Sequence, residues 1–395
     1  MKHQKHCYYW LVSALVLLLA VGLTACAGGQ PAPTQAPAVT KAPVAQPTVA
    51  QPPAPTQAAA VKPAATQAPA ASAGAKVKKV AIVIPASRTD HGWNQQGADN
   101  LTSVGKELGI TAEVAENQGY GDITPVLRDL QDKGFDLIIC HASGYQTVCP
   151  EFAKKTKVKV AAIENQAAVT PGLISDIETQ AQEAAYLAGV LAGKMTKSGT
   201  VGVVTSGEPP TWNYMTVGFA EGLKATKPDA KFLYSVIGEA AYEDAAGAKR
   251  VTASELAAGA DIIFGMGDGA SFGMVQAVEE HNAKGGAKAW FIDVIGDKRD
   301  IDKSKLLLSS VLFDYSGIYK QMIKDVEAGT FGKVYTMDVK NNGVHLLDLP
   351  PGVPADVADA VQKAKAEIVA DKLKVSAISD SQKMRARINE LFPKR

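Results

Sequence analysis

The strongest constraint on the fold of this chain is a regular alternation of short apolar runs with longer amphipathic segments. The runs at 80–85, 136–140 and 158–163 are too short for helices and lack polar alternation, which is typical of strands buried on both faces of a parallel sheet. Segment 94–108 has helical spacing, and its apolar face consists of Leu101, Val104 and Leu108. This alternation predicts a doubly wound α/β lobe.

The same pattern occurs a second time after an Ala-rich helix expected at 180–195. The expected strands of this series are 200–205, 231–237, 261–264 and 289–293, and its expected helices are 215–225, 245–257 and 274–281. The sequence therefore predicts an α/β fold with two doubly wound parallel-sheet lobes joined by crossing strands. We expect 77–172 plus 295–330 to form the N-terminal lobe, and 173–294 plus 331–395 to form the C-terminal lobe.

Residues 1–26 have the pattern of an export signal. A cationic start with Lys2 and Lys5 precedes an apolar run over 8–23, and Leu-Thr-Ala-Cys ends the segment at Cys26. This ending resembles the bacterial lipobox, in which the Cys thiol receives a diacylglyceryl group. We therefore predict lipidation at Cys26 and a chain anchored to the extracytoplasmic face of the cell membrane; the alternative is a signal anchor with a chance Cys.

Residues 27–76 are dominated by Pro, Ala, Gln, Thr and Val, and ten of the 21 prolines lie between Pro31 and Pro69. Such a segment cannot bury apolar surface and lacks an amide donor at each proline. It predicts a disordered tether between the membrane anchor and the globular body.

The composition excludes some partners. The chain has 41 Lys and Arg against 40 Asp and Glu, a net charge of +1, and no basic block with interleaved aromatic residues, so nothing indicates a nucleic-acid partner. No Cys/His cluster predicts a metal site, and no cofactor is expected. Cys140 and Cys149 are either a disulfide pair or two unpaired thiols.

In doubly wound sheets, ligands bind outside the carboxyl ends of the strands. The loop after the first strand contains Asp90, Trp93 and Asn94, in which an indole could stack on a planar ring while the polar groups bind its edge. The alternatives are a helix cap for Asp90 and a core ring for Trp93. Trp212 occupies the matching loop of the second series, where it could complete an aromatic sandwich or pack as core.

Three further candidates follow later strands. His141 and Tyr145 lie after the run 136–140, and Asp268 lies in the Gly-rich stretch 265–269. That stretch lacks the Lys and the spacing of nucleotide-phosphate loops, and Asp268 would repel an anion there. No nucleophile elbow or carboxylate triad is present, so we expect no catalytic residue and no enzyme activity.

These features resemble the basic membrane protein family, the nucleoside-binding lipoproteins of bacterial ABC importers, which have the type I periplasmic-binding fold. The resemblance rests on Asp-His-Gly-Trp-Asn at 90–94, Glu-Ala-Ala-Tyr-Leu-Ala-Gly at 183–189, and Gly-Ala-Asp-Ile-Ile-Phe at 259–264. It implies that Asp293 is the acid that accepts hydrogen bonds from a ribose. The Lys that such proteins often carry after a returning strand is missing at 310–314.

The expected function is capture of a solute, a purine nucleoside or related ring compound, for delivery to the permease and ATPase subunits of an ABC importer. Two lobes that close on a ligand by a hinge motion suit this task. Alternatives are a membrane-tethered sensor for a receptor kinase, an importer protein for a non-nucleoside solute, and a secreted hydrolase.

Overall fold

The computed structural model describes residues 75–393. The predicted signal segment, the lipidation site and nearly all of the predicted tether lie outside these residues. Within the described range, no helix combines the length and the apolar character that crossing a membrane requires.

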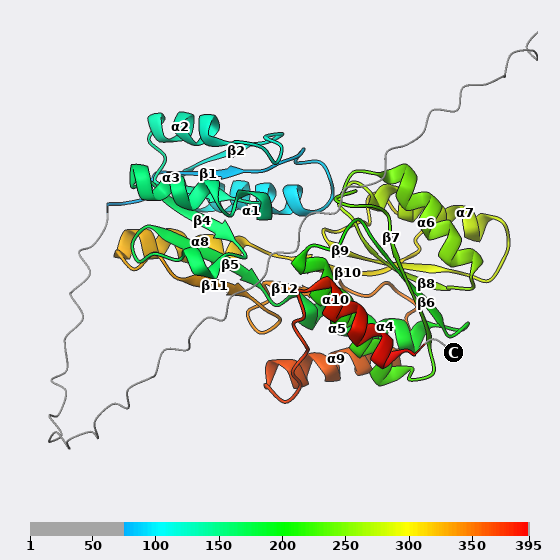
Figure 1. Cartoon of the computed structure of the whole chain (residues 1–395). Coiled ribbons are helices and arrows are strands. Elements are labelled where there is room, and N and C mark those ends of the chain that lie inside the picture. The colour runs from blue at the N-terminus through cyan, green and yellow to red at the C-terminus, as the bar shows by residue number, and fades with distance from the viewer. Residues whose placement is uncertain (1–74, 394–395) are drawn as a thin grey trace, which may run out of the picture. The chain divides into compact units, whose positions relative to one another are not determined.

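The first sheet has six strands, all paired in parallel (Figure 1). Their spatial order is β2 (Thr111–Ala115), β1 (Lys79–Val83), β3 (Leu137–Cys140), β4 (Lys159–Ile163), β5 (Ile174–Thr179) and β11 (Val334–Met337). Its helices are α1 (Trp93–Leu108), α2 (Thr124–Asp132), α3 (Val148–Thr156) and α8 (Ser316–Ala328). Short 3₁₀ turns occur at Ser143–Tyr145 and Gln166–Ala168.

The second sheet repeats this order, but its last strand is antiparallel. Its spatial order is β7 (Lys231–Val236), β6 (Thr200–Thr205), β8 (Ile262–Met266), β9 (Trp290–Ile295), β10 (Leu307–Phe313) and β12 (Val344–Leu346). Its helices are α4 (Ala181–Met195), α5 (Pro210–Thr226), α6 (Ala245–Ala257), α7 (Ser271–Ala283), α9 (Ala355–Val369) and α10 (Ser381–Leu391). The predicted class of two doubly wound lobes is confirmed.

The inner strands are mainly apolar because helices cover both faces of each sheet. On β1, Val80 and Ile82 pack in one core cluster with residues of α1, whereas Ala81 and Val83 pack in another with residues of α2 and α3. The short runs in the sequence are therefore strands with two buried faces.

Gly189, the last residue of the Tyr-Leu-Ala-Gly block, has a packing role between helices α4 and α5. A Cβ at Gly189 would lie 2.1 Å from the backbone oxygen of Phe219, and one at Gly222 would lie 2.0 Å from that of Tyr186. Glycine at these positions allows the two helices to approach closely.

The chain passes between the sheets three times: from β5 to α4, from β10 to α8, and from β11 to β12. The predicted lobe boundaries differ from this arrangement. Residues 174–179 and 334–337 belong to the first sheet, and 307–313 belong to the second. An apolar run fits the interior of either sheet equally well, so hydropathy cannot assign a crossing strand to its lobe.

Candidate functional site

A cavity lies where the carboxyl ends of strands from the two sheets face each other. It has about 490 Å³ of space not filled by protein atoms, its opening to solvent included. Its lining residues are Trp93, Tyr120, Ala142, Ser143, Ile163, Glu164, Pro209, Thr211, Trp212, Tyr242 and Asp268. They follow β1, β2, β3, β4, β6, β7 and β8, as the strand-end rule predicts.

The two tryptophans occupy equivalent places in the two lobes. Trp93 is the first residue of α1, and Trp212 lies in the first turn of α5. The Trp93 indole donates to the backbone oxygen of His141 at 2.8 Å, and the Trp212 indole donates to Ser206 Oγ at 3.0 Å. A hydrogen bond within its own lobe thus fixes the N–H edge of each indole ring, while both side chains line the cavity.

Asp90 and Asn94 support the start of α1 and are not among the lining residues. The Asp90 carboxylate accepts from the backbone N–H groups of Gly92, Asn94 and Gln95, and from the Asn94 side chain at 2.7 Å. This is the helix-capping role considered as the alternative for Asp90. Its effect is to fix the backbone from which Trp93 enters the cavity.

His141 and Tyr145 are fully buried behind the cavity wall. The His141 ring stacks on Trp93 with centroids 4.7 Å apart, and burial lowers the pKa of His141 to about 4, so the ring is neutral at physiological pH. The Tyr145 hydroxyl donates to the backbone oxygen of Gly119 at 2.6 Å. Both residues position the groups that line the cavity.

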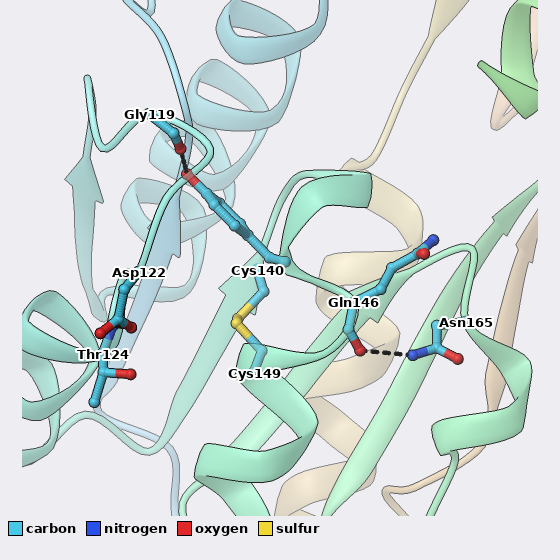
Figure 2. The surroundings of a disulfide bond; sticks show 8 residues. Gly119, Asp122, Thr124, Cys140, Gln146, Cys149 and Asn165 are labelled. Carbon is cyan, nitrogen blue, oxygen red and sulfur yellow. Dashed lines mark hydrogen bonds between the residues drawn. A yellow bond between two sulfur atoms is a disulfide. The ribbon is translucent and has the colours of Figure 1, made fainter. Parts of the chain in front are cut away.

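Cys140 and Cys149 form a disulfide, which decides the question that the sequence left open (Figure 2). The segment between them contributes Ala142 and Ser143 to the cavity. Gln146 in the same segment accepts from the Asn165 side chain at 2.8 Å and donates to the backbone oxygen of Glu164 at 2.9 Å. The disulfide therefore fixes one loop of the wall and, through Gln146, supports the next.

Two acidic side chains line the cavity, one from each lobe. Asp268 follows β8 and accepts from the backbone N–H of Trp93 at 2.9 Å. Burial raises the pKa of Asp268 to about 8, and the charge of Asp90 adds to this shift. Glu164 follows β4 and accepts from the hydroxyls of Thr211 and Tyr214; burial raises its pKa as well.

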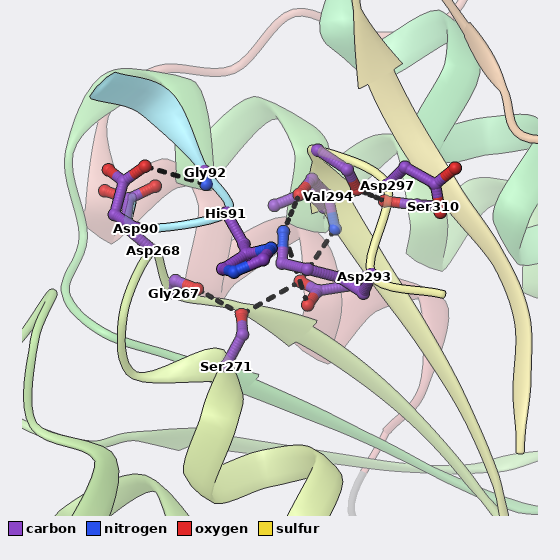
Figure 3. Close-up of polar contacts among 12 residues, drawn as sticks. Asp90, His91, Gly92, Gly267, Asp268, Ser271, Asp293, Val294, Asp297 and Ser310 are labelled. Carbon is purple, nitrogen blue, oxygen red and sulfur yellow. Dashed lines mark hydrogen bonds and ion pairs between the residues drawn. The ribbon is translucent and has the colours of Figure 1, made fainter. Parts of the chain in front are cut away.

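Asp293 is fully buried in the second lobe and is not among the lining residues. Its carboxylate accepts from Ser271 Oγ at 3.2 Å and lies 3.7 Å from the buried ammonium of Lys298 (Figure 3). Burial raises the pKa of Asp293, while Lys298 acts in the opposite direction. In this conformation Asp293 is part of an internal ion pair.

The lobes also touch beside the cavity. His91 lies 3.2 Å from Asp300 through its Nδ1, and its ring packs edge-on against Phe272 at 5.2 Å. A Cβ at Gly92 would lie 2.3 Å from Asp268, and one at Gly296 would lie 2.2 Å from the backbone oxygen of His91. Because these atoms of the two lobes are in contact, the cleft is closed in this conformation.

Eight of the eleven lining residues are outside the predicted set, and Glu164, Tyr242, Thr211 and Tyr120 are four of them. Glu164 and Tyr242 directly follow or lie near predicted strand ends, so the strand-end rule could have found them. Thr211 directly precedes Trp212 in the sequence and lies in the same loop after a predicted strand. Tyr120 follows β2, an edge strand of mixed polarity that the hydropathy pattern does not reveal. Among residues 75–393, no group of three or more His, Cys, Asp or Glu side chains could hold a metal ion.

Two doubly wound lobes, three crossing segments and an aromatic cavity between them define a solute-binding protein of the periplasmic-binding type. The family model for "ABC transporter substrate-binding protein PnrA-like" proteins matches residues 77–379, and the chain belongs to this family. Its members are substrate-binding proteins rather than enzymes.

Two relatives are each about a quarter identical to the chain over the aligned residues. The ABC transporter nucleoside-binding protein BmpA of Lactococcus lactis is 26% identical over 308 residues, which cover 72% of this chain and 85% of the relative. An uncharacterized lipoprotein of Pyrococcus abyssi is 28% identical over 273 residues, covering 66% of this chain and 67% of the relative.

Solved structures support the fold. An ABC transporter solute-binding protein of Aeropyrum pernix superposes with a TM-score of 0.68 at 21% identity, covering 80% of this chain and 97% of its own. At this identity the likeness shows the fold alone.

Proposed function

We propose that the protein is a lipid-anchored component of an ABC importer that captures a purine nucleoside or a related ring compound. The observation that carries the proposal is that Trp93 and Trp212 line one cavity from opposite lobes. Indole faces stack favourably on flat rings, and closure between the lobes would bring both onto one solute. The name of the L. lactis relative, a nucleoside-binding protein, supports the same ligand class.

Closure of the two lobes on the solute would also prepare the protein to deliver that solute to the importer. The closed form would dock on a permease and release the solute there, while a diacylglyceryl group on Cys26 keeps the protein at the extracytoplasmic face of the membrane. The lipoprotein names of the Pyrococcus relatives support this location.

The test is calorimetric titration of the purified protein with adenosine, guanosine, cytidine and the free bases. Trp93→Ala and Trp212→Ala should each weaken binding about tenfold or more, because stacking on one aromatic ring contributes roughly 1–3 kcal/mol per base. Trp290→Ala is the matched control, since Trp290 on β9 contacts Lys288 and does not line the cavity. Absence of binding for the whole panel would refute this ligand class.

A sensor function is the second candidate, because a relative from Bacillus subtilis, 23% identical, is named a transcriptional activator. Uptake of a radiolabelled solute in cells with and without the gene separates the two functions. Unchanged uptake would favour sensing.

A further inference from the structure

The two acids of the cavity have reciprocal positions across the cleft. Asp268 belongs to the second lobe, and its Oδ1 accepts from the first N–H of helix α1 in the first lobe, that of Trp93, at 2.9 Å. Glu164 belongs to the first lobe, and its Oε1 accepts from Thr211 Oγ1 and Tyr214 OH, both near the start of α5 in the second lobe. Each lobe thus supplies one carboxyl group to the opening turn of the other lobe's helix.

These helix starts are favourable places for a carboxylate, because the exposed N–H groups give them partial positive charge. They also carry the two cavity tryptophans, Trp93 and Trp212. Each of the two carboxyl groups therefore meets the opposite lobe beside one of the cavity tryptophans.

The second oxygen of each acid has no protein partner. Within the described chain, no residue donates a hydrogen bond to Asp268 Oδ2 or Glu164 Oε2, and neither oxygen is among its fully buried unpaired polar atoms, so both oxygens keep access to the space of the cavity. No Lys, Arg or His is among the described residues that line the cavity. A carboxyl oxygen that lines the cavity and lacks a protein donor can accept a hydrogen bond from a solute, so a solute that brings donors would take the place of water there.

We propose that Asp268 and Glu164 are the specificity-determining pair of the cavity: they select a solute that presents hydrogen-bond donors, such as ring amino groups, and they make closure depend on those donors. The inference rests on the proposed function in one respect, that this cavity is the solute site. The pair disfavours anionic solutes, since no cationic side chain faces the space between them.

The pair also opposes closure of an empty cleft, because closure takes both carboxyl groups out of water. Burial raises the pKa of Asp268 to about 8 and raises that of Glu164. The other charged or titratable groups that act on the two acids are Asp90, Glu243, Lys298, Tyr120, Tyr242, Asp176, Tyr214 and Tyr315. Lys298 is the only cation of this set, so the balance is acidic.

The direction of the pH dependence follows from these shifts. In the closed, empty protein the two acids keep their protons up to a higher pH. In the open form both acids are solvated and lose these protons at a lower pH. Closure is therefore most favourable at low pH and becomes less favourable as the pH rises toward the closed-state pKa of Asp268, about 8. For each titrating carboxyl the closing constant falls by up to about tenfold per pH unit in that interval.

The first experiment needs no ligand. Small-angle scattering of the unliganded protein should show a larger radius of gyration at pH 8 than at pH 5.5, and the double variant Asp268→Asn with Glu164→Gln should remain compact at both. Asp359→Asn, an exposed acid on α9, is the matched control and should open like the wild type. A wild-type radius that does not change with pH would overturn the proposal.

The second experiment compares solutes that differ by one amino group: adenosine with purine riboside, and guanosine with inosine. In at least one pair, loss of the amino group should weaken binding about ten- to a hundredfold, the effect of one charge-assisted hydrogen bond. The difference should fall below about threefold in Asp268→Asn or Glu164→Gln. Equal affinities within both pairs would overturn the proposal. If none of the four binds, the nucleoside class fails, and the scattering result alone decides the role of the pair.

Discussion

Replacing Gly92 by Ala should block full closure of the cleft without changing either lobe. A Cβ at this position would lie 2.3 Å from Asp268 Oδ1 and 2.9 Å from Asp268 Cα, both across the cleft. Since non-bonded heavy atoms normally stay more than 3 Å apart, the lobes must separate here by roughly 1 Å. That separation breaks the hydrogen bond from Trp93 N–H to Asp268.

An ordinary hydrogen bond contributes roughly 0.5–1.5 kcal/mol, so Gly92→Ala should weaken solute binding about two- to tenfold. The loss should appear mainly as faster dissociation in stopped-flow fluorescence, because the clash exists only in the closed form. The thermal midpoint of the empty protein should stay within about 2 °C of the wild type. Gly317→Ala on α8 is the control, since a Cβ there meets nothing within 4 Å. Wild-type affinity in Gly92→Ala would refute the closed-cleft geometry.

Three other changes test separate parts of the structure. Lys298→Met should destabilise the protein by about 3–5 kcal/mol, measured by urea unfolding, because it leaves the buried Asp293 without its counter-ion; an unchanged midpoint would contradict the internal ion pair. Cys140→Ser with Cys149→Ser should lower stability by about 2–3 kcal/mol, the chain-entropy value for so short a loop, and weaken solute binding; unchanged stability in the double variant would contradict the disulfide. Cys26→Ser should abolish labelling by a palmitate analogue, and equal label would contradict lipidation.

The fold was largely predictable because the strands are buried on both faces. Runs such as 136–140 and 158–163 contain no polar alternation, so their hydropathy alone indicates a parallel sheet. Strand β2 was not predictable this way, because it lies at a sheet edge and its exposed residues include Thr111. In the sequence, strands β5 and β10, which precede two of the crossings between sheets, resemble any other apolar run. The lobe to which each belongs is therefore decided only by the strand with which it pairs.

The candidate site was predicted in part. Trp93, Trp212 and Asp268 do line one cavity, because strand ends of facing sheets converge there. Asp90 was not assignable from the sequence, because a carboxylate before a helix can either cap the helix or bind a ligand; its hydrogen bonds to the backbone of α1 show the capping role. Asp293 also ends up internal, because Lys298, five residues later, turns back toward it.

The central claim is that the cavity between the lobes holds a small ring compound. The most direct measurement is mass spectrometry of the small molecules released by denaturing protein that was purified gently from its native membrane. We expect about one equivalent of a nucleoside or related donor-bearing ring compound, and none from a variant carrying Trp93→Ala and Trp212→Ala. An anionic or non-aromatic solute, or a ring compound retained equally by that variant, would contradict it.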